Sequence, residues 1–381
     1  MKIIIAPDSY KDCMSAIQVA SYMEEGVLKA VANPEIIKVP VADGGEGTVQ
    51  AMLMGAGGRI VRTKATGPLR DEIDSFFGVL ADGKTAVIEM AAASGLELVP
   101  EHHRNPLNTT TFGTGELILA ALNEGCTDII IGVGGSSTTD CGMGMAQALG
   151  VVFYDSERKP LSYGGRFMNE VKYYDDSALD PRIKKARIRV ACDVTNPLYG
   201  RKGAAYVYSA QKGASQRQVK HLDEGLRNMA SVIEEATGHD ISTIPGAGAA
   251  GGLAAGLIAF AGATIEKGID IVMDACKLGD KIKGADLVLT GEGNTNVQTA
   301  YGKVPAGIAA LAKKESVPVI CISGSISPGY EEVFKTGITA VFSIAAGPLS
   351  LKKAIKEASV NLIDTTYNVI RAFTASNPER N

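Results

Sequence analysis

KIIIAPDSYKDCMSAIQVASYMEEGVLKAV, residues 2–31, contains an apolar run, a polar loop and an amphipathic segment in that order. Lys2–Ala6 is rich in β-branched side chains and ends at Pro7, which is typical of a buried strand. Ser15, a preferred helix N-cap, precedes apolar residues at helical spacing. These residues are Ala16, Val19, Ala20, Met23, Val27 and Val31. The stretch therefore predicts a strand, a loop and a helix, the repeating unit of an α/β protein.

The same order recurs along most of the chain. Further strands are expected at residues 36–41, 128–133, 187–192, 286–290, 317–322 and 338–343. Further helices are expected at residues 114–123, 215–236, 303–314 and 350–373. Because strands that alternate with helices of this length form parallel sheets, we expect an α/β fold with helices on both faces of its sheets.

The middle of the chain departs from this order. Ile73–Leu80 and Thr85–Met90 are strand-like and are joined by a turn-forming segment, ADGK, which predicts a β-hairpin. A hairpin does not fit one continuous doubly wound domain. We therefore expect a Rossmann-like parallel-sheet domain made of residues 1–59 and 284–381. Residues 60–283 are expected to form a second α/β domain inserted into it.

Composition excludes several classes of protein. The 381 residues are 45% hydrophobic and 21% charged, which is ordinary for a globular protein and excludes a disordered or fibrous chain. The formal net charge is −4 and the Lys/Arg pairs are scattered. Nucleic acid and anionic membrane surfaces are therefore not expected partners. An oligomer is compatible with the sequence, which carries no signal for its size.

Cysteine usage and hydropathy bear on location. The chain opens with MKIIIAPDS, whose apolar run is too short for a signal sequence. Its six cysteines show no C-x-x-C spacing, so we expect reduced thiols and a cytoplasmic location. Residues 241–265 carry no charge, but they include Pro245 and several glycines. We expect a buried Gly/Ala helix there rather than a membrane span.

Five loops follow expected strands directly, at the edge where open parallel sheets bind ligands. The first loop holds Asp8, Ser9 and Lys11, which could bind a polar substrate or a phosphate, or could form a helix-entry turn. The second, residues 43–48, reads DGGEGT. Its backbone amides favour an anion, whereas its acids favour hydroxyl groups or a metal ion. A small hydroxy acid would satisfy both demands.

Two further loops have the composition of phosphate-binding loops. Residues 134–144 read GGSSTTDCGMG, with four consecutive hydroxyls before an expected helix and no Walker A lysine. Residues 290–293 read TGEG and are followed by polar residues on the way to the next helix. Those residues are Asn294, Asn296, Gln298 and Lys303. A hydroxyl-rich surface loop and a plain glycine-rich turn are the respective alternatives.

Two weaker signals remain. Asp193 ends an expected strand, and it could be a functional carboxylate or a turn initiator before Asn196-Pro197. Residues 246–251 match the G-x-G-x-x-G dinucleotide fingerprint, but only a poor strand precedes them. Close packing of a Gly/Ala helix explains these glycines better.

Seven motifs occur in an order that resembles the bacterial type 1 glycerate kinases, and the match spans the whole chain. The motifs are residues 8–11 (DSYK), 41–48 (VADGGEGT), 90–96 (MAAASGL), 113–117 (GTGEL), 134–140 (GGSSTTD), 246–253 (GAGAAGGL) and 290–293 (TGEG). The resemblance implies a flavodoxin-like domain interrupted by a second α/β domain, with the active site in the cleft between them. It also implies phosphorylation of D-glycerate with ATP and Mg²⁺, commonly at the 2-hydroxyl.

The chain departs from the family pattern at a few positions. Tyr10 stands where the family usually has Phe, and residues 137–139 read STT where it usually has ATN. Asn294 and Asn296 stand where it usually has Arg and Asp. Two interpretations follow: an ion pair replaced by an amide pair, or the loss of a cation that stabilises the transition state.

The sequence therefore predicts a kinase that converts D-glycerate and ATP into phosphoglycerate, with 2-phosphoglycerate favoured, and ADP. Lys11 is expected to contact the transferred phosphoryl group, and Asp193 to act as general base or Mg²⁺ ligand. The expected glycerate-binding residues are Asp8, Ser9, Asp43, Gly44, Gly45 and Glu46. The expected nucleotide-binding residues are Gly134, Gly135, Ser136, Ser137, Gly291, Glu292, Gly293, Gln298 and Lys303. The alternatives are a catalytically weak binding protein of the same fold and, less favoured, a dinucleotide-dependent oxidoreductase.

Overall fold

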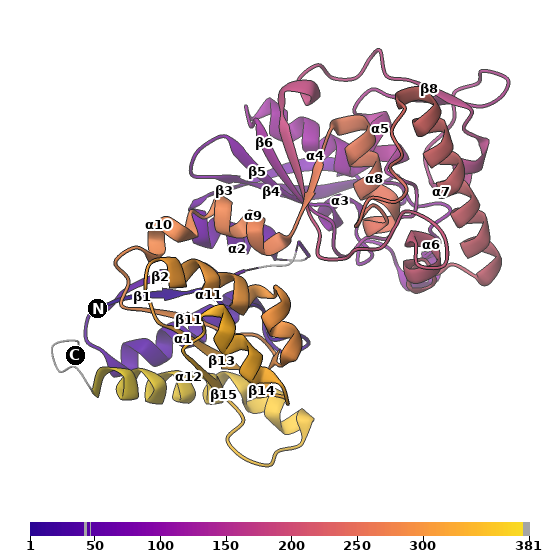
Figure 1. Cartoon of the computed structure of the whole chain (residues 1–381). Helices are drawn as coiled ribbons and strands as arrows, with labels where there is room; N and C mark the ends of the chain where they lie inside the picture. Colours follow the sequence, from indigo (N-terminus) through magenta and orange to yellow (C-terminus); the bar gives the residue numbers. More distant parts are fainter. Residues whose placement is uncertain (42–43, 46, 376–381) are drawn as a thin grey trace. The chain divides into compact units, whose positions relative to one another are not determined.

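The computed structural model describes residues 1–41, 44–45 and 47–375. The chain divides into two compact units, each made of more than one segment. Unit 1 comprises Met1–Ala42, Gln50–Gly57 and Ile269–Asn381, and unit 2 comprises Asp43–Val49 and Gly58–Gly268. Both ends of the chain therefore belong to unit 1, as the indigo and yellow segments of Figure 1 show.

Unit 1 is built on a parallel five-stranded sheet of order β15-β13-β11-β1-β2. Its strands span Lys2–Ile5 (β1), Glu35–Lys38 (β2), Leu287–Thr290 (β11), Val319–Ser323 (β13) and Ala340–Ser343 (β15). The central strands β1, β11 and β13 are mostly apolar, because both faces of the sheet are buried. Counted along the chain, the order is 2-1-3-4-5, the doubly wound order of flavodoxin-like sheets. This order reverses between β1 and β11, where such sheets bind ligands.

The first and last helices of unit 1 pack against each other. Helix α1 has a complete capping box, in which Ser15 Oγ accepts from Gln18 N–H and Gln18 Oε1 accepts from Ser15 N–H. Its buried face is the apolar stripe expected from the sequence. The helices of the unit are α1 (Ala16–Ala30), α2 (Thr48–Ala56), α9 (Gly268–Ala275), α10 (Leu278–Ile282), α11 (Val304–Lys314) and α12 (Leu351–Ala375).

Unit 2 is built on a six-stranded sheet of order β10-β9-β6-β5-β4-β3. Its strands span Gly58–Thr66 (β3), Glu72–Leu80 (β4), Thr85–Glu89 (β5), Asp128–Gly132 (β6), Arg187–Ala191 (β9) and Thr264–Glu266 (β10). β5, β6, β9 and β10 are parallel, whereas β3, β4 and β5 pair antiparallel. A separate small ribbon pairs Val152–Tyr154 (β7) with Tyr173–Asp175 (β8). The expected α/β class with parallel sheets is confirmed.

Helices also pack on the sheet of unit 2, and its largest apolar cluster joins them to the inner strands. The helices of this unit are α3 (Ala91–Ser94), α4 (Phe112–Asn123), α5 (Met143–Ala148), α6 (Ala204–Tyr208), α7 (Gln216–Thr237) and α8 (Ala249–Ala261). The uncharged stretch 241–265 therefore contains a buried helix, whose start is kinked by the left-handed backbone of Ala250, Gly251 and Gly252. Within the described ranges, no helix has the length and apolar character needed to cross a membrane.

The unit boundaries differ from the expected ones at three places. Residues 269–283 belong to unit 1 rather than to the insertion, and residues 43–49 and 58–59 belong to unit 2. The first difference has a packing cause: Cys276 Sγ lies 4.0 Å from the carbonyl oxygen of Met52, and Lys281 Nζ donates to that of Gly55. These contacts attach α9 and α10 to the end of α2.

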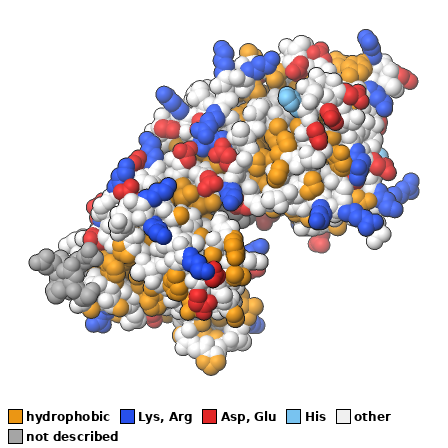
Figure 2. Space-filling view, viewed as in Figure 1, with side chains coloured by type: hydrophobic (Ala, Val, Ile, Leu, Met, Phe, Trp, Pro, Cys, Tyr) orange, Lys and Arg blue, Asp and Glu red, His pale blue; other side chains and the backbone are white. Residues whose placement is uncertain are grey.

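On the face drawn in Figure 2, Lys and Arg side chains are interspersed with Asp and Glu over most of the surface, and several Lys and Arg side chains gather at the lower right edge. Exposed ion pairs such as Lys29–Glu25 on α1 and Lys64–Asp74 on β3 and β4 add little to stability.

The close contact between α1 and α12 gives a test of how much their packing stabilises unit 1. A Cβ atom at Gly26 would lie 2.6 Å from the carbonyl oxygen of Ile363 and 2.7 Å from Thr366 Cβ. We expect Gly26→Ala to lower the free energy of unfolding by about 1–3 kcal/mol in urea denaturation. Gly279→Ala in α10 is the control, since its Cβ would meet Leu311 at an ordinary 3.6 Å. It should be neutral or stabilising by up to about 1 kcal/mol; equal losses would contradict the prediction.

Candidate active site

In unit 1, two of the predicted ligand loops meet at the carboxyl ends of β1 and β11. The backbone N–H of Asp8 donates to the carbonyl oxygen of Gly291 over 2.8 Å. Gly291 must lack a side chain, because a Cβ atom there would lie 1.8 Å from the carbonyl oxygen of Ile322. A Cβ at Gly293 would lie 3.3 Å from the backbone nitrogen of Lys11. The point at which strand order reverses thus brings the two loops together.

The loop after β1 has a buried anchor and an exposed cation. Tyr10 is buried, and its hydroxyl donates to the carbonyl oxygen of Ile322 over 2.6 Å. Burial raises the pKa of this phenol well above its usual value, so it stays protonated. Asp8 Oδ1 accepts from the backbone N–H of Ser9 over 2.7 Å. The Lys11 side chain is exposed and makes no ion pair with any residue that the structure describes, which leaves its charge available to a ligand.

Glu292 is the centre of a small polar network in the loop after β11. Its side chain is buried, and Oε1 accepts from the hydroxyls of Thr299 and Thr295. Its Oε2 accepts from Lys303 Nζ over 3.1 Å, and the Lys303 side chain is 40% exposed. Gln298 is exposed beside them. The carboxylate of Glu292 is therefore occupied by protein groups that hold the loop, and direct contact of Glu292 or Lys303 with a nucleotide stays a prediction.

Asn294 and Asn296 do not form the amide pair that one interpretation of the sequence requires. Asn294 Oδ1 accepts from the hydroxyls of Ser325 and Ser327 over 3.1 and 3.0 Å. Asn296 Oδ1 accepts from the backbone N–H of Gln298 over 2.8 Å and caps the short helix that follows. Aspartate is an equally good cap, so the family's usual residue at 296 could make the same contact.

In unit 2, a second group of predicted loops meets at the carboxyl ends of β6 and β9. The backbone N–H of Gly134 donates to the carbonyl oxygen of Gly44 over 3.1 Å. A Cβ atom would lie 2.4 Å from Gly44 O at Gly132, and 2.6 Å from Gly45 Cα at Gly134. A Cβ at Gly44 would lie 2.8 Å from the carbonyl oxygen of Ala191. These glycines allow backbone to pack directly on backbone.

Two predicted residues of this group, Asp43 and Glu46, lie outside the described residues. The rest of their loop is fixed at its helical end, where Thr48 Oγ1 donates to the carbonyl oxygen of Gly45 over 2.7 Å. The backbone N–H of Val49 donates to Glu89 Oε1, also over 2.7 Å. Glu89 is a buried carboxylate at the end of β5 that the sequence did not single out. It holds the backbone of Val49, which belongs to the same unit, and hence the end of this loop.

Three of the four consecutive hydroxyls after β6 point into the protein. Ser137 Oγ donates to the carbonyl oxygen of Ser94 over 2.9 Å. Thr139 Oγ1 lies 2.9 Å from Ser209 Oγ. Thr138 Oγ1 is buried and has no hydrogen-bond partner among the described residues. Composition suggested a cradle of four hydroxyls, but only the first of them, Ser136, remains for a ligand.

Lys212 is a functional candidate that sequence reasoning missed. Its Nζ donates to Ser136 Oγ over 2.7 Å and to the carbonyl oxygen of Thr138 over 2.6 Å, and its side chain is buried. Burial lowers its pKa to about 7, against which the nearby negative charge of Asp140 acts. Ser136 and Lys212 are 76 residues apart, and no local motif marks the lysine. Only the tertiary fold reveals the contact.

Asp140 closes the hydroxyl-rich loop from the inside. Its carboxylate accepts from Thr111 N–H and Oγ1 over 2.9 and 2.8 Å, and from the backbone N–H groups of Gly142 and Gly144. Burial raises the pKa of Asp140, while these hydrogen bonds oppose the shift. Asp140 therefore fixes the turn that leads into α5, and it is not free to bind a ligand.

Asp193 follows β9, as expected from its place in the sequence. Its Oδ1 accepts from the backbone N–H of Gly268 over 3.1 Å. Within the described residues, no three or more His, Cys, Asp or Glu side chains gather in a way that could hold a metal ion. Mg²⁺ in phosphoryl-transfer sites is bound by one or two carboxylates and the phosphates of the substrate. A Mg²⁺ that arrives with the nucleotide is thus compatible with Asp193, whose role stays a prediction.

Comparison with known proteins identifies the family. Residues 3–374 match the model of the glycerate kinase family. A glycerate 2-kinase from Escherichia coli is 48% identical over 369 residues, which is 97% of each chain. A glycerate kinase from Halalkalibacterium halodurans is 47% identical over 367 residues, or 96% of this chain and 97% of the relative. The chain belongs to the glycerate kinase family.

Structural comparison agrees. A crystal structure from Salmonella typhimurium, provisionally named glycerate kinase 2, matches this glycerate kinase family member with a TM-score of 0.88. The two sequences are 46% identical, and the match covers 99% of each chain. The family resemblance seen in the sequence motifs is therefore confirmed.

Within this glycerate kinase family member, the predicted site residues fall into two groups. The group in unit 1 contains Asp8, Ser9, Lys11, Gly291, Glu292, Gly293, Gln298 and Lys303. The group in unit 2 contains Gly44, Gly45, Gly134, Gly135, Ser136, Ser137 and Asp193. Each unit thus holds one loop predicted for glycerate and one predicted for the nucleotide. The roles of these residues, and the expected cleft, stay predictions.

The glycines of residues 246–251 have a packing role. A Cβ atom at Gly251 would lie 2.1 Å from the carbonyl oxygen of Thr138, and one at Gly256 would lie 2.4 Å from that of Cys141. Helix α8 therefore packs closely on the hydroxyl-rich loop. The described residues 239–248 contain no strand, so the context that the dinucleotide fingerprint requires is missing there.

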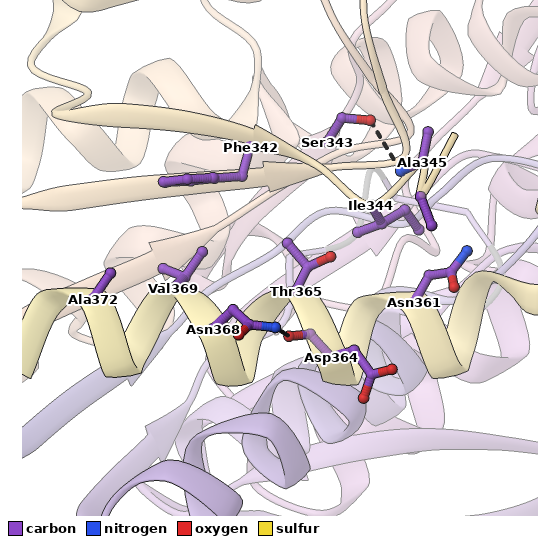
Figure 3. A pocket seen from close by; sticks show the side chains of 11 residues that line it. Phe342, Ser343, Ile344, Ala345, Asn361, Asp364, Thr365, Asn368, Val369 and Ala372 are labelled. Atoms are coloured by element: carbon purple, nitrogen blue, oxygen red, sulfur yellow. Dashed lines mark hydrogen bonds between the residues drawn. The ribbon is translucent and has the colours of Figure 1, made fainter. Parts of the chain in front are cut away.

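A pocket of about 360 Å³ lies elsewhere in unit 1, between the end of β15 and α12. Figure 3 shows that Asn361, Asp364 and Asn368 of α12 lie along it, with Phe342 and Ile344 on the strand side. Asn368 uses its amide to donate to the backbone oxygen of Asp364. None of the predicted site residues lines this pocket.

Proposed function

We propose that the protein phosphorylates D-glycerate with ATP, releasing ADP and 2-phosphoglycerate. The similarity to proteins named glycerate kinase and glycerate 2-kinase over 96% or more of this chain carries the proposal. The two groups of loops at sheet edges support it, because phosphoryl transfer needs alignment and charge neutralisation more than covalent chemistry. We further propose that the protein works in the cytoplasm.

In the proposed reaction, backbone N–H groups of the glycine-rich loops bind phosphate oxygens. Gly134 and Gly135 follow β6, and Gly291 and Gly293 follow β11, so all four lie at carboxyl edges of parallel strands. The Gly134 N–H donates to the carbonyl oxygen of Gly44, so Gly134 is proposed to shape its loop and the other three glycines to offer their N–H groups. Lys11, exposed and without an ion pair among the described residues, neutralises the transferred phosphoryl group. Mg²⁺ enters with ATP as part of the substrate and supplies positive charge to the phosphates.

Glycerate is proposed to bind near Asp8 and Ser9 and near the Gly44–Gly45 backbone. Carboxylate oxygens of such loops accept from sugar-like hydroxyls, whereas backbone N–H groups bind the glycerate carboxylate. Asp193 is proposed to act either as the base that takes the proton of the attacking hydroxyl or as a ligand of the Mg²⁺ that ATP brings.

The experiment that tests this function is a coupled assay of ADP release with D-glycerate and ATP. The expected result is turnover that requires both substrates, with ³¹P NMR showing the phosphate on the 2-hydroxyl. Saturable binding of both ligands without turnover would favour a binding protein of the same fold. Formation of NADH from glycerate and NAD⁺ would favour an oxidoreductase and sink the kinase proposal.

Lys11 gives the first prediction about residues. If its ammonium neutralises the transferred phosphoryl group, Lys11→Met should lower kcat at least a hundredfold and change the KM for glycerate much less. Steady-state kinetics at saturating ATP would measure both. Lys29→Met in α1 is the matched control, because Lys29 is an exposed lysine of the same unit that pairs only with Glu25. An unchanged kcat in Lys11→Met would remove Lys11 from the site.

Asn294 and Asn296 give the second prediction about residues. Asn296→Asp keeps the cap on Gln298, and Asn294→Arg loses only the hydroxyl contacts of Ser325 and Ser327. We therefore expect the double substitution to change kcat/KM less than tenfold, or below about 1.4 kcal/mol. Asn296→Asp alone should be worse than the double change, since it adds an unpaired negative charge beside the proposed nucleotide loop. A hundredfold gain in the double variant would mean that the natural chain has lost a transition-state contact.

A further inference from the structure

Two cations of unit 2 are buried, and they are stabilised in different ways. The guanidinium of Arg189 donates to both carboxylate oxygens of Asp128, over 3.1 and 2.8 Å. Lys212 makes no ion pair within the described part of the chain, and its two hydrogen bonds go to a hydroxyl and a carbonyl oxygen. A buried ammonium without a paired anion is costly, and natural proteins rarely keep one without a function.

The position of Lys212 is fixed by the backbone around it. It ends a short 3₁₀ helix, Ala210–Lys212, and Gly213 follows with φ +91°. A Cβ atom at Gly213 would lie 2.1 Å from the carbonyl oxygen of Arg104, so the turn packs directly on that segment. The backbone around Gly213 therefore fixes the position from which the Lys212 ammonium contacts the loop after β6.

The hydrogen bond from Lys212 decides what Ser136 can do. A serine hydroxyl has one donor hydrogen and two acceptor sites. An ammonium can only donate, so Ser136 Oγ must accept from Lys212, and its own hydrogen is turned to another partner. Gly134 and Gly135, which precede Ser136, carry no side chains, and Ser136 itself is 9% exposed. The Gly134 N–H already donates to the carbonyl oxygen of Gly44, so the Ser136 hydroxyl, rather than this N–H group, is the donor that suits a phosphate oxygen.

We propose that Lys212 is a positioning residue, which acts through Ser136 to present a hydrogen-bond donor to a phosphate oxygen at the Gly134–Ser136 loop. The proposal rests on the proposed function, which assigns this loop to the nucleotide. It adds a residue that no loop motif contains, and it links phosphate binding to the charge on a buried lysine. Thr138, whose carbonyl oxygen accepts the second hydrogen bond, anchors the ammonium from the inner side.

The charged groups around Lys212 determine how phosphate binding should depend on pH. Asp140 is the acidic group that acts on it, and Asp140 is already held by four hydrogen bonds. The neighbouring Cys141 thiol is neutral because burial raises its pKa, and the Arg104 Nε donates to Val99 O. With its pKa lowered to about 7, Lys212 is partly deprotonated at neutral pH. A bound phosphate favours the charged form, so binding takes up a proton and weakens as pH rises above 7.

The test is calorimetric binding of ADP to the full chain between pH 6 and pH 9. In the wild type, affinity should fall by up to tenfold per pH unit above pH 7, beyond the change that the ligand's own ionisation causes. Lys212→Met should bind ADP at least tenfold more weakly at pH 6.5 and lose this extra pH dependence. Lys212→Arg keeps its charge at every pH in the range, so it should bind without the decline. Ser136→Ala should weaken binding as Lys212→Met does.

Measuring the thermal stability of Lys212→Met distinguishes a positioning role of Lys212 from a purely structural one. Burial of an ammonium without a paired anion costs stability, and an apolar side chain of similar volume removes that cost. Lys212→Met should therefore melt at no lower temperature than the wild type at pH 6, although it binds ADP more weakly. Lys281→Met is the matched control: Lys281 is a part-buried lysine of unit 1 whose pKa burial also lowers, and it donates to Gly55 O. Its ADP binding should follow the wild type at every pH.

The ligands in the experiment identify the source of the phosphate. If Lys212→Met weakens the binding of ADP, the phosphate comes from the nucleotide. If it weakens the binding of 2-phosphoglycerate and inorganic phosphate instead, the phosphate comes from the product. Either result supports the proposal. An effect on D-glycerate alone, which has a carboxylate but no phosphate, would overturn it. So would equal affinities and pH profiles in the wild type and Lys212→Met. Turnover of D-glycerate by the wild type is measured separately, so that failure of the kinase proposal is distinguished from failure of this one.

Discussion

A Cβ atom at Gly132 would lie 2.4 Å from the carbonyl oxygen of Gly44, and one at Gly291 would lie 1.8 Å from that of Ile322. At both places two segments of backbone pack so closely that only glycine, which has no Cβ atom, fits there. The loops at the carboxyl edge of each sheet therefore hold their backbone in fixed positions. Fixed backbone N–H donors suit the anions of phosphoryl transfer, because they need no reorganisation. The 44 glycines of the chain are explained in part by this constraint.

The two sheets reach this result by different routes. In unit 1 the strand order reverses between β1 and β11, and the loops after these two strands meet at that point, where open parallel sheets bind ligands. In unit 2 the parallel strands β5, β6, β9 and β10 lie in chain order, without a reversal. Its loops are gathered instead by Gly44, which lies on the ends of β6 and β9, and by the hydrogen bonds of Lys212. A topological rule explains the first site, whereas specific contacts explain the second.

Sequence reasoning was most successful where the hydrophobic period was long and unbroken. The helix after Ser15 and the hairpin of β4 and β5 follow from local patterns alone. β3 was not expected, because its exposed residues include Arg59, Arg62 and Lys64 and it lacks an apolar strand pattern. It forms a strand because it pairs with β4 along its whole length. The loops after the strands could also be located, since the rule that places ligands there depends only on strand direction.

The side-chain chemistry inside those loops could not be predicted, because composition does not say which way a hydroxyl points. Four consecutive hydroxyls looked like a cradle, yet Ser137 and Thr139 bond inward and Thr138 has no partner among the described residues. The cation that acts on the remaining hydroxyl comes from a helix end 76 residues away. The buried ammonium of Lys212 and the unpartnered hydroxyl of Thr138 meet at this loop, where Lys212 Nζ donates to the carbonyl oxygen of Thr138. Both features cost stability. Because such departures from local rules are expected at functional sites, they support the proposal that the Gly134–Ser136 loop binds a ligand.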